Sequence, residues 1–168
     1  MAGNMKAVKL RIKSVQSTMQ ITKAMELVAS SKLRKAKERA ETCRPYFTEL
    51  HETLKDIARE NIDFSSVYAR ESSNPRYCYV AIAGDRGLAG GYNANLFKCL
   101  EAAAEGKDYV VLPIGKKAVE YFRQRGIECL TDKFAEIADI SVADCFEIAN
   151  LLCEEFRKGT FGHIELCY

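Results

Sequence analysis

The glycine-rich segment at residues 84–91 (GDRGLAGG) comes closest to a sequence that could bind phosphate. It follows a short apolar stretch and precedes a helical pattern, which is where a strand-to-helix turn can cradle a phosphate. Its glycines fit neither GxGxxG nor GxxxxGK[ST], and the next predicted strand ends without an acid for a ribose hydroxyl. A tight structural turn is therefore favoured over a nucleotide site. Asp85 and Arg86 are expected to form a local pair or a subunit contact.

Few other residues have the spacing that catalysis or metal binding requires. His51 and His163 are the only histidines, and neither has a second ligand or a nucleophile suitably spaced along the sequence. Ser30 and Ser31 lie among cations, but no base is spaced to orient them. We therefore expect no catalytic residue, no cofactor and no metal site in this chain.

Seven cysteines are spread along the chain without a CxxC pair. Most occupy positions where a small apolar side chain would pack, which predicts reduced core residues in a protein that faces the cytosol. The sequence shows no signal peptide and no apolar run near the roughly 20 residues that span a bilayer. Any association with a membrane is therefore expected to go through a partner.

A long helix is expected over residues 1–61, because one heptad phase of mostly apolar residues runs from Met5 to Ile57. Such a helix would reach about 80 Å at 1.5 Å per residue. Pro45 is expected to kink the helix or to let it restart. A stripe this long predicts a coiled coil with another helix. The seam consists of Met5, Val8, Ile12, Val15, Met19, Thr22, Glu26, Ala29, Leu33, Ala36, Ala40, Cys43, Phe47, Leu50, Leu54 and Ile57.

The seam loses its simple pattern near its middle. Thr22 and Glu26 are polar seam positions, and around them Ile21, Met25 and Val28 turn apolar side chains to other faces. Apolar residues on several faces are typical of a helix that is enclosed on more than one side. We therefore expect this part of the helix to lie inside a surrounding structure.

Charge is divided unevenly along the chain. Residues 1–60 carry 13 Lys and Arg against 7 acids, whereas residues 61–168 carry 12 against 16. The basic excess lies before residue 45, so that segment should bind an acidic partner. Its basic run at 32–39 could instead bind nucleic acid, as basic regions ahead of leucine zippers do. The seam passes through this run, which favours a protein partner, and nucleic acid remains the alternative.

The remainder of the chain predicts a polar linker at 62–76 and a Rossmann-like, mostly parallel α/β domain at 77–168. Strands alternate with helices, and the last helix opens with a capping box of Ser141 and Asp144. Its inner face is expected to hold Val142, Cys145, Phe146, Ala149, Leu152, Cys153 and Phe156. Strands are expected at 77–83, 109–114 and 161–168, helices at 93–104, 116–125 and 141–159, and a short extended piece at 127–130. Because the sequence stops inside the last predicted strand, we expect a fragment of a longer protein.

Two segments of the sequence resemble one known family. Residues 12–18 (IKSVQST) and 21–34 (ITKAMELVASSKLR) resemble the N-terminal helix of the γ subunit of F-type ATP synthases. Residues 84–93 (GDRGLAGGYN) resemble the glycine turn at the start of the same family's α/β domain. The similarity covers essentially the whole chain, but the family's second long helix is absent from it. That helix would be the missing partner of the seam.

The resemblance implies a central-stalk rotor subunit that has no active site of its own. In this family the two long helices wind as an antiparallel coiled coil inside a ring of three α and three β subunits, and the α/β domain meets the ε subunit and the membrane c-ring. Rotation driven by ion flow changes nucleotide affinity at the β subunits, which couples ion transport to ATP synthesis. The subunit would be peripheral on the cytoplasmic face of a bacterial plasma membrane, or on the matrix face of an organelle membrane, without membrane insertion.

Carried over residue by residue, the resemblance implies two sets of partner contacts and no nucleic-acid ligand. The expected contacts with the stator ring are Ile21, Lys23, Met25, Val28, Lys32, Arg34 and Lys35. The expected contacts with ε or the c-ring are Asp85, Arg86, Tyr92 and Asn93. Many family members have Cys where this chain has Ala89, and the chain lacks the cysteine insertion of chloroplast γ subunits, so no thiol control is expected.

Overall fold

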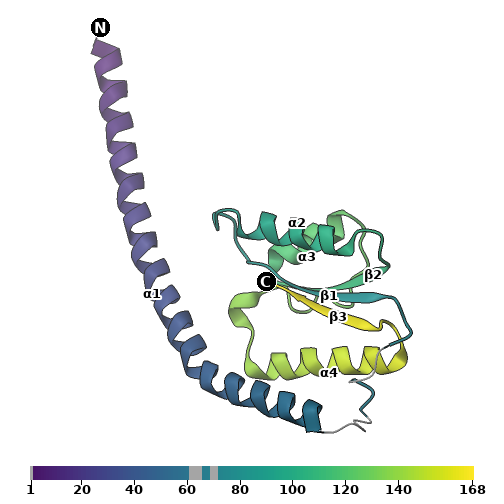
Figure 1. The fold of residues 1–168 in the computed structure, drawn as a ribbon. Coiled ribbons are helices and arrows are strands. Elements are labelled where there is room, and N and C mark those ends of the chain that lie inside the picture. Colours follow the sequence, from purple (N-terminus) through teal and green to yellow (C-terminus); the bar gives the residue numbers. More distant parts are fainter. Residues whose placement is uncertain (1, 61–65, 69–71) are drawn as a thin grey trace. The chain divides into compact units, whose positions relative to one another are not determined.

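The computed structural model describes residues 2–60, 66–68 and 72–168 (Figure 1). It divides into two compact units, Met1–Phe64 and Ser65–Tyr168. Of the predicted linker at 62–76, residues 62–65 and 69–71 lie outside the described residues.

The first unit is a single helix, α1 (Ala2–Glu60), as the heptad pattern predicted. The helix continues through Pro45, and its axis bends in the half that contains this proline (Figure 1). A proline removes one backbone hydrogen bond from the helix and thereby favours a bend. The polar seam residue Thr22 satisfies its hydroxyl within the helix, because Oγ1 donates to the carbonyl oxygen of Thr18 at 2.9 Å.

α1 buries no part of its apolar seam. Every side chain from residue 5 to residue 56 is exposed, including Met25 at 59% and Leu33 at 70%. A straight or gently bent helix cannot fold its own stripe away from water. The seam therefore has no partner within the described part of this unit.

The second unit contains a three-stranded parallel sheet in the order β2-β1-β3. The strands are β1 (Tyr77–Ile82), β2 (Tyr109–Ile114) and β3 (His163–Cys167). Tyr77 of the central strand is in register with Tyr109 on one side and with His163 on the other. Helices α2 and α3 cover one face of the sheet and α4 covers the other (Figure 1). The predicted parallel, three-layered α/β arrangement is confirmed.

The helices of this unit are α2 (Tyr92–Ala104), α3 (Lys116–Gln124) and α4 (Val142–Lys158). Their bounds lie within one or two residues of the predicted ones. The extended piece predicted at 127–130 is reduced to a single parallel bridge between Val111 and Cys129. A short 3-10 helix, η1 (Ile137–Asp139), was not predicted.

The core consists of two clusters, one on each face of the sheet. Tyr79 and Ala81 of β1 pack with Phe97 and Phe122 beneath α2 and α3. Cys78 and Val80, which alternate with them along β1, point to the other face and pack with Phe134 and Phe161 on the α4 side. A central parallel strand covered on both faces is expected to be apolar throughout, as β1 is.

The capping box of α4 is confirmed, and its predicted inner face is correct at Leu152 and Phe156 but wrong at four other positions. Ser141 and Asp144 bond reciprocally, whereas Val142 and Phe146 are 74% and 67% exposed. Cys145 and Ala149 are exposed as well. The apolar arc of α4 is wider than the strip that the sheet covers, so its flank stays in water. The residues that pack against the core are Ile148, Leu151, Leu152 and Phe156.

The prediction that most cysteines are core residues is confirmed only in part, since Cys78 is buried and Cys129 and Cys167 pack, partly buried, against the core. All seven are free thiols, but only Cys78 is buried, and Cys43, Cys99 and Cys145 are exposed. Burial raises the pKa of the Cys78 thiol to about 12, which keeps it protonated at neutral pH. The exposed cysteines lie on helices, at apolar positions of the sequence pattern. Within the described residues, no neighbouring element covers these positions.

Gly115 is a position in the α/β unit where a side chain would meet both an unfavourable backbone conformation and a backbone clash. Its φ is +93°, and an added Cβ would lie 2.1 Å from the carbonyl oxygen of Ala83. We expect Gly115→Ala to lower the free energy of unfolding by about 2–4 kcal/mol. Gly87→Ala is the matched control, because its Cβ would meet no atom within 4 Å. Urea unfolding followed by tyrosine fluorescence checks this, and equal stability of the two variants would contradict it.

Backbone amides of α1 should exchange far faster than those of the sheet when this chain is studied alone. A helix draws most of its stability from the packing of its apolar face, and this face is exposed. We expect amides at residues 5–40 to show little protection in hydrogen exchange, unless the seam is covered by a non-native contact, while those of β1 remain strongly protected. A well-protected, monomeric helix over 5–40 would contradict this expectation.

Candidate functional site

α1 carries the seven residues expected to contact a ring of partner subunits. At about 100° per residue, five of them share one face of the helix, whereas Lys23 and Arg34 lie on the opposite face. We call the five the contact stripe. The contact stripe consists of Ile21, Met25, Val28, Lys32 and Lys35. It runs beside the seam, so this part of α1 presents two neighbouring stripes.

The contact stripe changes from apolar to basic along the helix. Its three apolar side chains are 57–59% exposed. Its two lysines and Lys23 form no ion pair with any residue that the structure describes. Arg34 differs, because its Nε lies 3.7 Å from Glu38 Oε1. The order of side chains matches a partner that offers an apolar surface followed by acidic groups.

The glycine-rich segment connects β1 to α2, and Asp85 ties it to other parts of the unit. Asp85 Oδ1 accepts from the amides of Lys116 at 3.2 Å and Ile137 at 2.9 Å. Its Oδ2 accepts from the amide of Ala138 at 3.1 Å. The carboxylate therefore bonds backbone amides, and the expected local pair with Arg86 does not form.

These contacts determine the ionisation of Asp85. Partial burial by itself would raise the pKa of this carboxyl group. The hydrogen bonds from Ile137, Ala138 and Lys116, together with the Lys116 ammonium, outweigh that effect and lower the pKa below the ordinary aspartate value. Asp85 is therefore a carboxylate at neutral pH.

Two further residues expected to contact a partner also bond inward. Asn93 Oδ1 accepts from the amide of Gly84 at 2.9 Å, and the Tyr92 hydroxyl donates to the carbonyl of Ile82 at 2.8 Å. The Tyr92 ring is nevertheless 44% exposed, and Arg86 is exposed as well. The structure thus gives Asp85 and Asn93 internal roles, and contact of all four residues with a partner stays a prediction.

Leu88 was not singled out in the sequence, although it is the most exposed apolar side chain of the turn. It is fully exposed and adopts a φ of +63°, a conformation that few residues other than glycine take up. The signal in the sequence was an apolar residue placed between glycines in a turn. Exposed apolar side chains of this kind are typical of contact surfaces.

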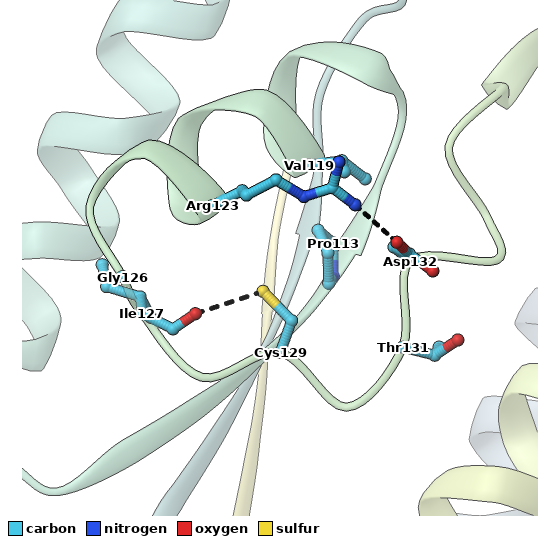
Figure 2. A pocket seen from close by; sticks show the side chains of 8 residues that line it. All are labelled: Pro113, Val119, Arg123, Gly126, Ile127, Cys129, Thr131 and Asp132. Atoms are coloured by element: carbon cyan, nitrogen blue, oxygen red, sulfur yellow. Dashed lines mark hydrogen bonds and ion pairs between the residues drawn. The ribbon is translucent and has the colours of Figure 1, made fainter.

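A surface cavity of about 440 Å³ lies beside α3 (Figure 2). Arg123 of α3 donates to Asp132, and the Cys129 thiol donates to the carbonyl of Ile127 at 3.5 Å (Figure 2). The main charged groups of the cavity, Arg123 and Asp132, thus bind each other. None of the residues predicted to contact a partner lines the cavity. The cavity is lined by Pro113, Val119, Arg123, Gly126, Ile127, Cys129, Thr131 and Asp132.

The described residues include no group of three His, Cys, Asp or Glu side chains placed to hold a metal ion. His51 stacks on Phe47 in α1 with ring centroids 5.8 Å apart, and His163 stacks on Tyr77 at 4.6 Å. Among the helices that the structure describes, none is long and apolar enough to cross a membrane.

Comparison with known proteins agrees with the resemblance seen in the sequence. The chain matches the ATP synthase family over residues 4–168. An ATP synthase gamma chain from Ruminococcus albus is 50% identical over 172 residues, which cover 99% of this chain and 59% of that relative. An ATP synthase gamma chain from Alkaliphilus metalliredigens is 41% identical, over 100% of this chain and 58% of the relative.

A third relative is named as specific for sodium ions. This ATP synthase gamma chain from Acetobacterium woodii is 36% identical over 169 residues, or 100% of this chain and 56% of the relative. The chain thus spans less than two thirds of the length of these curated relatives. Because the family match extends over almost the whole chain, the chain belongs to the family of ATP synthase gamma chains.

Proposed function

We propose that this chain forms part of the central-stalk rotor of an F-type ATP synthase. The observation that carries the proposal is the exposure of two neighbouring stripes along α1, the seam and the contact stripe. Two stripes on one helix, one mostly apolar and the other apolar then basic, need two different partners. In the proposal, a second long helix covers the seam and the α and β subunits surround the contact stripe.

The rotor acts by contact rather than by catalysis in this proposal. Rotation driven by ion flow through the c-ring brings α1 against each β subunit in turn. Because α1 makes different contacts with each β conformation, it shifts their populations and hence their nucleotide affinity. ATP is made or hydrolysed at the β subunits, and this chain supplies no catalytic group.

The exposed cations of α1 suit contacts that must form and break repeatedly. Ion pairs of exposed lysines contribute about 0–1 kcal/mol each, so no single pair would hold the rotor in one position. The apolar residues of the contact stripe, Ile21, Met25 and Val28, would supply the remaining contact area inside the ring. Lys23 and Arg34 would meet acidic groups on the opposite side of the helix.

The α/β unit would bind the ε subunit or the c-ring through its glycine-rich turn. Arg86, Leu88 and the Tyr92 ring offer exposed side chains there, while Asp85 and Asn93 hold the turn in place. Through these partners the chain would be peripheral to the cytoplasmic face of a bacterial plasma membrane, or to the matrix face of an organelle membrane.

A helix that binds nucleic acid is the second candidate function. The observation in its favour is that Lys23, Lys32 and Lys35 are exposed and form no ion pair with the described residues. Such cations on a helix can neutralise phosphates. The apolar side chains between them are unnecessary for this purpose, which is why we favour the rotor.

Charge reversal on the contact stripe should weaken binding to the catalytic ring. We expect Lys32→Glu with Lys35→Glu to lower the affinity for an α3β3 hexamer from Ruminococcus albus by about tenfold, since each exposed pair contributes up to about 1 kcal/mol. The matched control reverses Glu38 and Glu41 to Lys, which leaves the contact stripe intact. Binding is measured by surface plasmon resonance, and equal affinity of the two double variants would contradict the proposal.

Binding to DNA separates the two candidate functions. The rotor proposal predicts only weak association of the chain with a random duplex at about 150 mM salt, with a dissociation constant in the non-specific range of about 10⁻⁴–10⁻⁶ M. Fluorescence anisotropy of a labelled duplex measures it. Nanomolar binding that persists at this salt concentration would favour the nucleic-acid candidate.

A further inference from the structure

We propose that Asp85 is an internal latch, whose carboxylate fills an anion-binding nest at the N-terminus of α3 and thereby fixes the exposed tip at residues 86–91. The latch is a property of the α/β unit itself and does not depend on the proposed rotor function. Asp85 acts in it as a positioning residue. The nest accepts a carboxylate or another small oxyanion.

The donors of the nest come from two separate elements. Lys116 is the first residue of α3, and its amide has no acceptor within the helix. Ile137 and Ala138 belong to η1 and direct their amides to the same carboxylate. Three backbone amides that converge on one group form a concave site with positive potential, which the N-terminal end of the α3 dipole strengthens.

The two elements are also joined to each other and to the turn. The amide of Gly115 donates to the carbonyl of Phe134 at 2.9 Å, which holds the segment before η1 against the start of α3. The carbonyl of Gly84 accepts from the amide of Lys117 at 3.0 Å. Gly84 and Asp85 are therefore bonded to α2, α3 and η1, and the exposed tip begins at the very next residue.

The charges around the nest favour an anion. The charged side chains that act on Asp85 or on Lys116 include Lys116 itself, Arg86 and Glu136. Lys116 Nζ lies 2.6 Å from Glu136 Oε1, so Glu136 partly offsets the lysine. The backbone amides consequently supply most of the attraction for the carboxylate.

The position of the nest explains why an anion would bind there. It lies where β1 and β2 end, and α/β proteins commonly hold phosphate at the carboxyl ends of parallel strands, on a helix N-terminus. In this chain the position is filled by a residue of the turn itself. The Asp85 carboxylate therefore takes the place of a bound ligand. Backbone amides hold the turn through it, and packing of the turn's own side chains does not.

Hydrogen exchange on the full 168-residue chain tests the latch. We expect Asp85→Ala to speed amide exchange at Lys116, Ile137 and Ala138 by about tenfold or more, because each amide loses a charged acceptor. Asp132→Asn is the matched control, since Asp132 bonds the Arg123 side chain and no backbone amide. Unchanged exchange in Asp85→Ala would overturn the proposal, as would equal acceleration in the control.

Formate separates a vacant anion nest from a general loss of packing. We expect about 0.1 M sodium formate to slow exchange at these amides in Asp85→Ala, whereas sodium chloride at equal ionic strength does not. Asp85→Asn, whose amide group still fills the space, should not respond to formate. An equal response to both salts would overturn the proposal. If Asp85→Ala fails to fold, exchange in Asp85→Asn still decides it. The Asn oxygen can still accept from Lys116 and Ile137, but the NH2 group that replaces Oδ2 cannot accept from Ala138, so the Ala138 amide must exchange faster there.

The pH dependence of wild type gives an independent test. Because the pKa of Asp85 is lowered in the folded state, the stabilisation by its carboxylate is present above the ordinary aspartate pKa of about 3.9 and is lost as the pH falls through the folded-state pKa. The difference in exchange between wild type and Asp85→Asn should therefore be full at neutral pH and vanish in acid. A difference that does not decrease at all as the solution is acidified would contradict the latch.

Discussion

An α-helix cannot bury a stripe that runs along its own length, and this constraint determines how the chain is organised. α1 exposes an apolar seam together with the contact stripe beside it, and among the side chains that the structure describes every buried one belongs to the α/β unit. The apolar side chains of the first unit are thus left exposed, whereas the second unit builds a core on both faces of its sheet. The two units differ in the source of their stability as well as in their secondary structure.

The elements of the α/β unit could be predicted because their signals are local. β2 ends where the sequence places Gly115, and α4 starts at its capping box. The side of α4 that meets the sheet could not be predicted, because Val142 and Ile148 are both apolar. Only the placement of the helix against the strands decides which of them is covered.

The candidate site was predictable in its location but not in the direction of its side chains. The glycine pattern indicated a turn after β1, yet the acceptor role of Asp85 depends on amides that lie 52 and 53 residues further along the chain. Those amides belong to η1, a short 3-10 helix without a capping motif or a recognisable repeat. The ring contacts of α1 were implied by the family resemblance, and helical periodicity places five of the seven residues, the contact stripe, on one face.

The strand order has a consequence for the synthesis of this protein on the ribosome. β1 is the central strand, and one of its two neighbours, β3, is made more than 80 residues later, with His163 pairing with Tyr77. The sheet cannot close until translation has reached β3, because non-local pairs form only when both strands are available. During that interval the nascent chain displays an apolar helix and an unpaired strand edge, so it should be a client for chaperones that shield such surfaces.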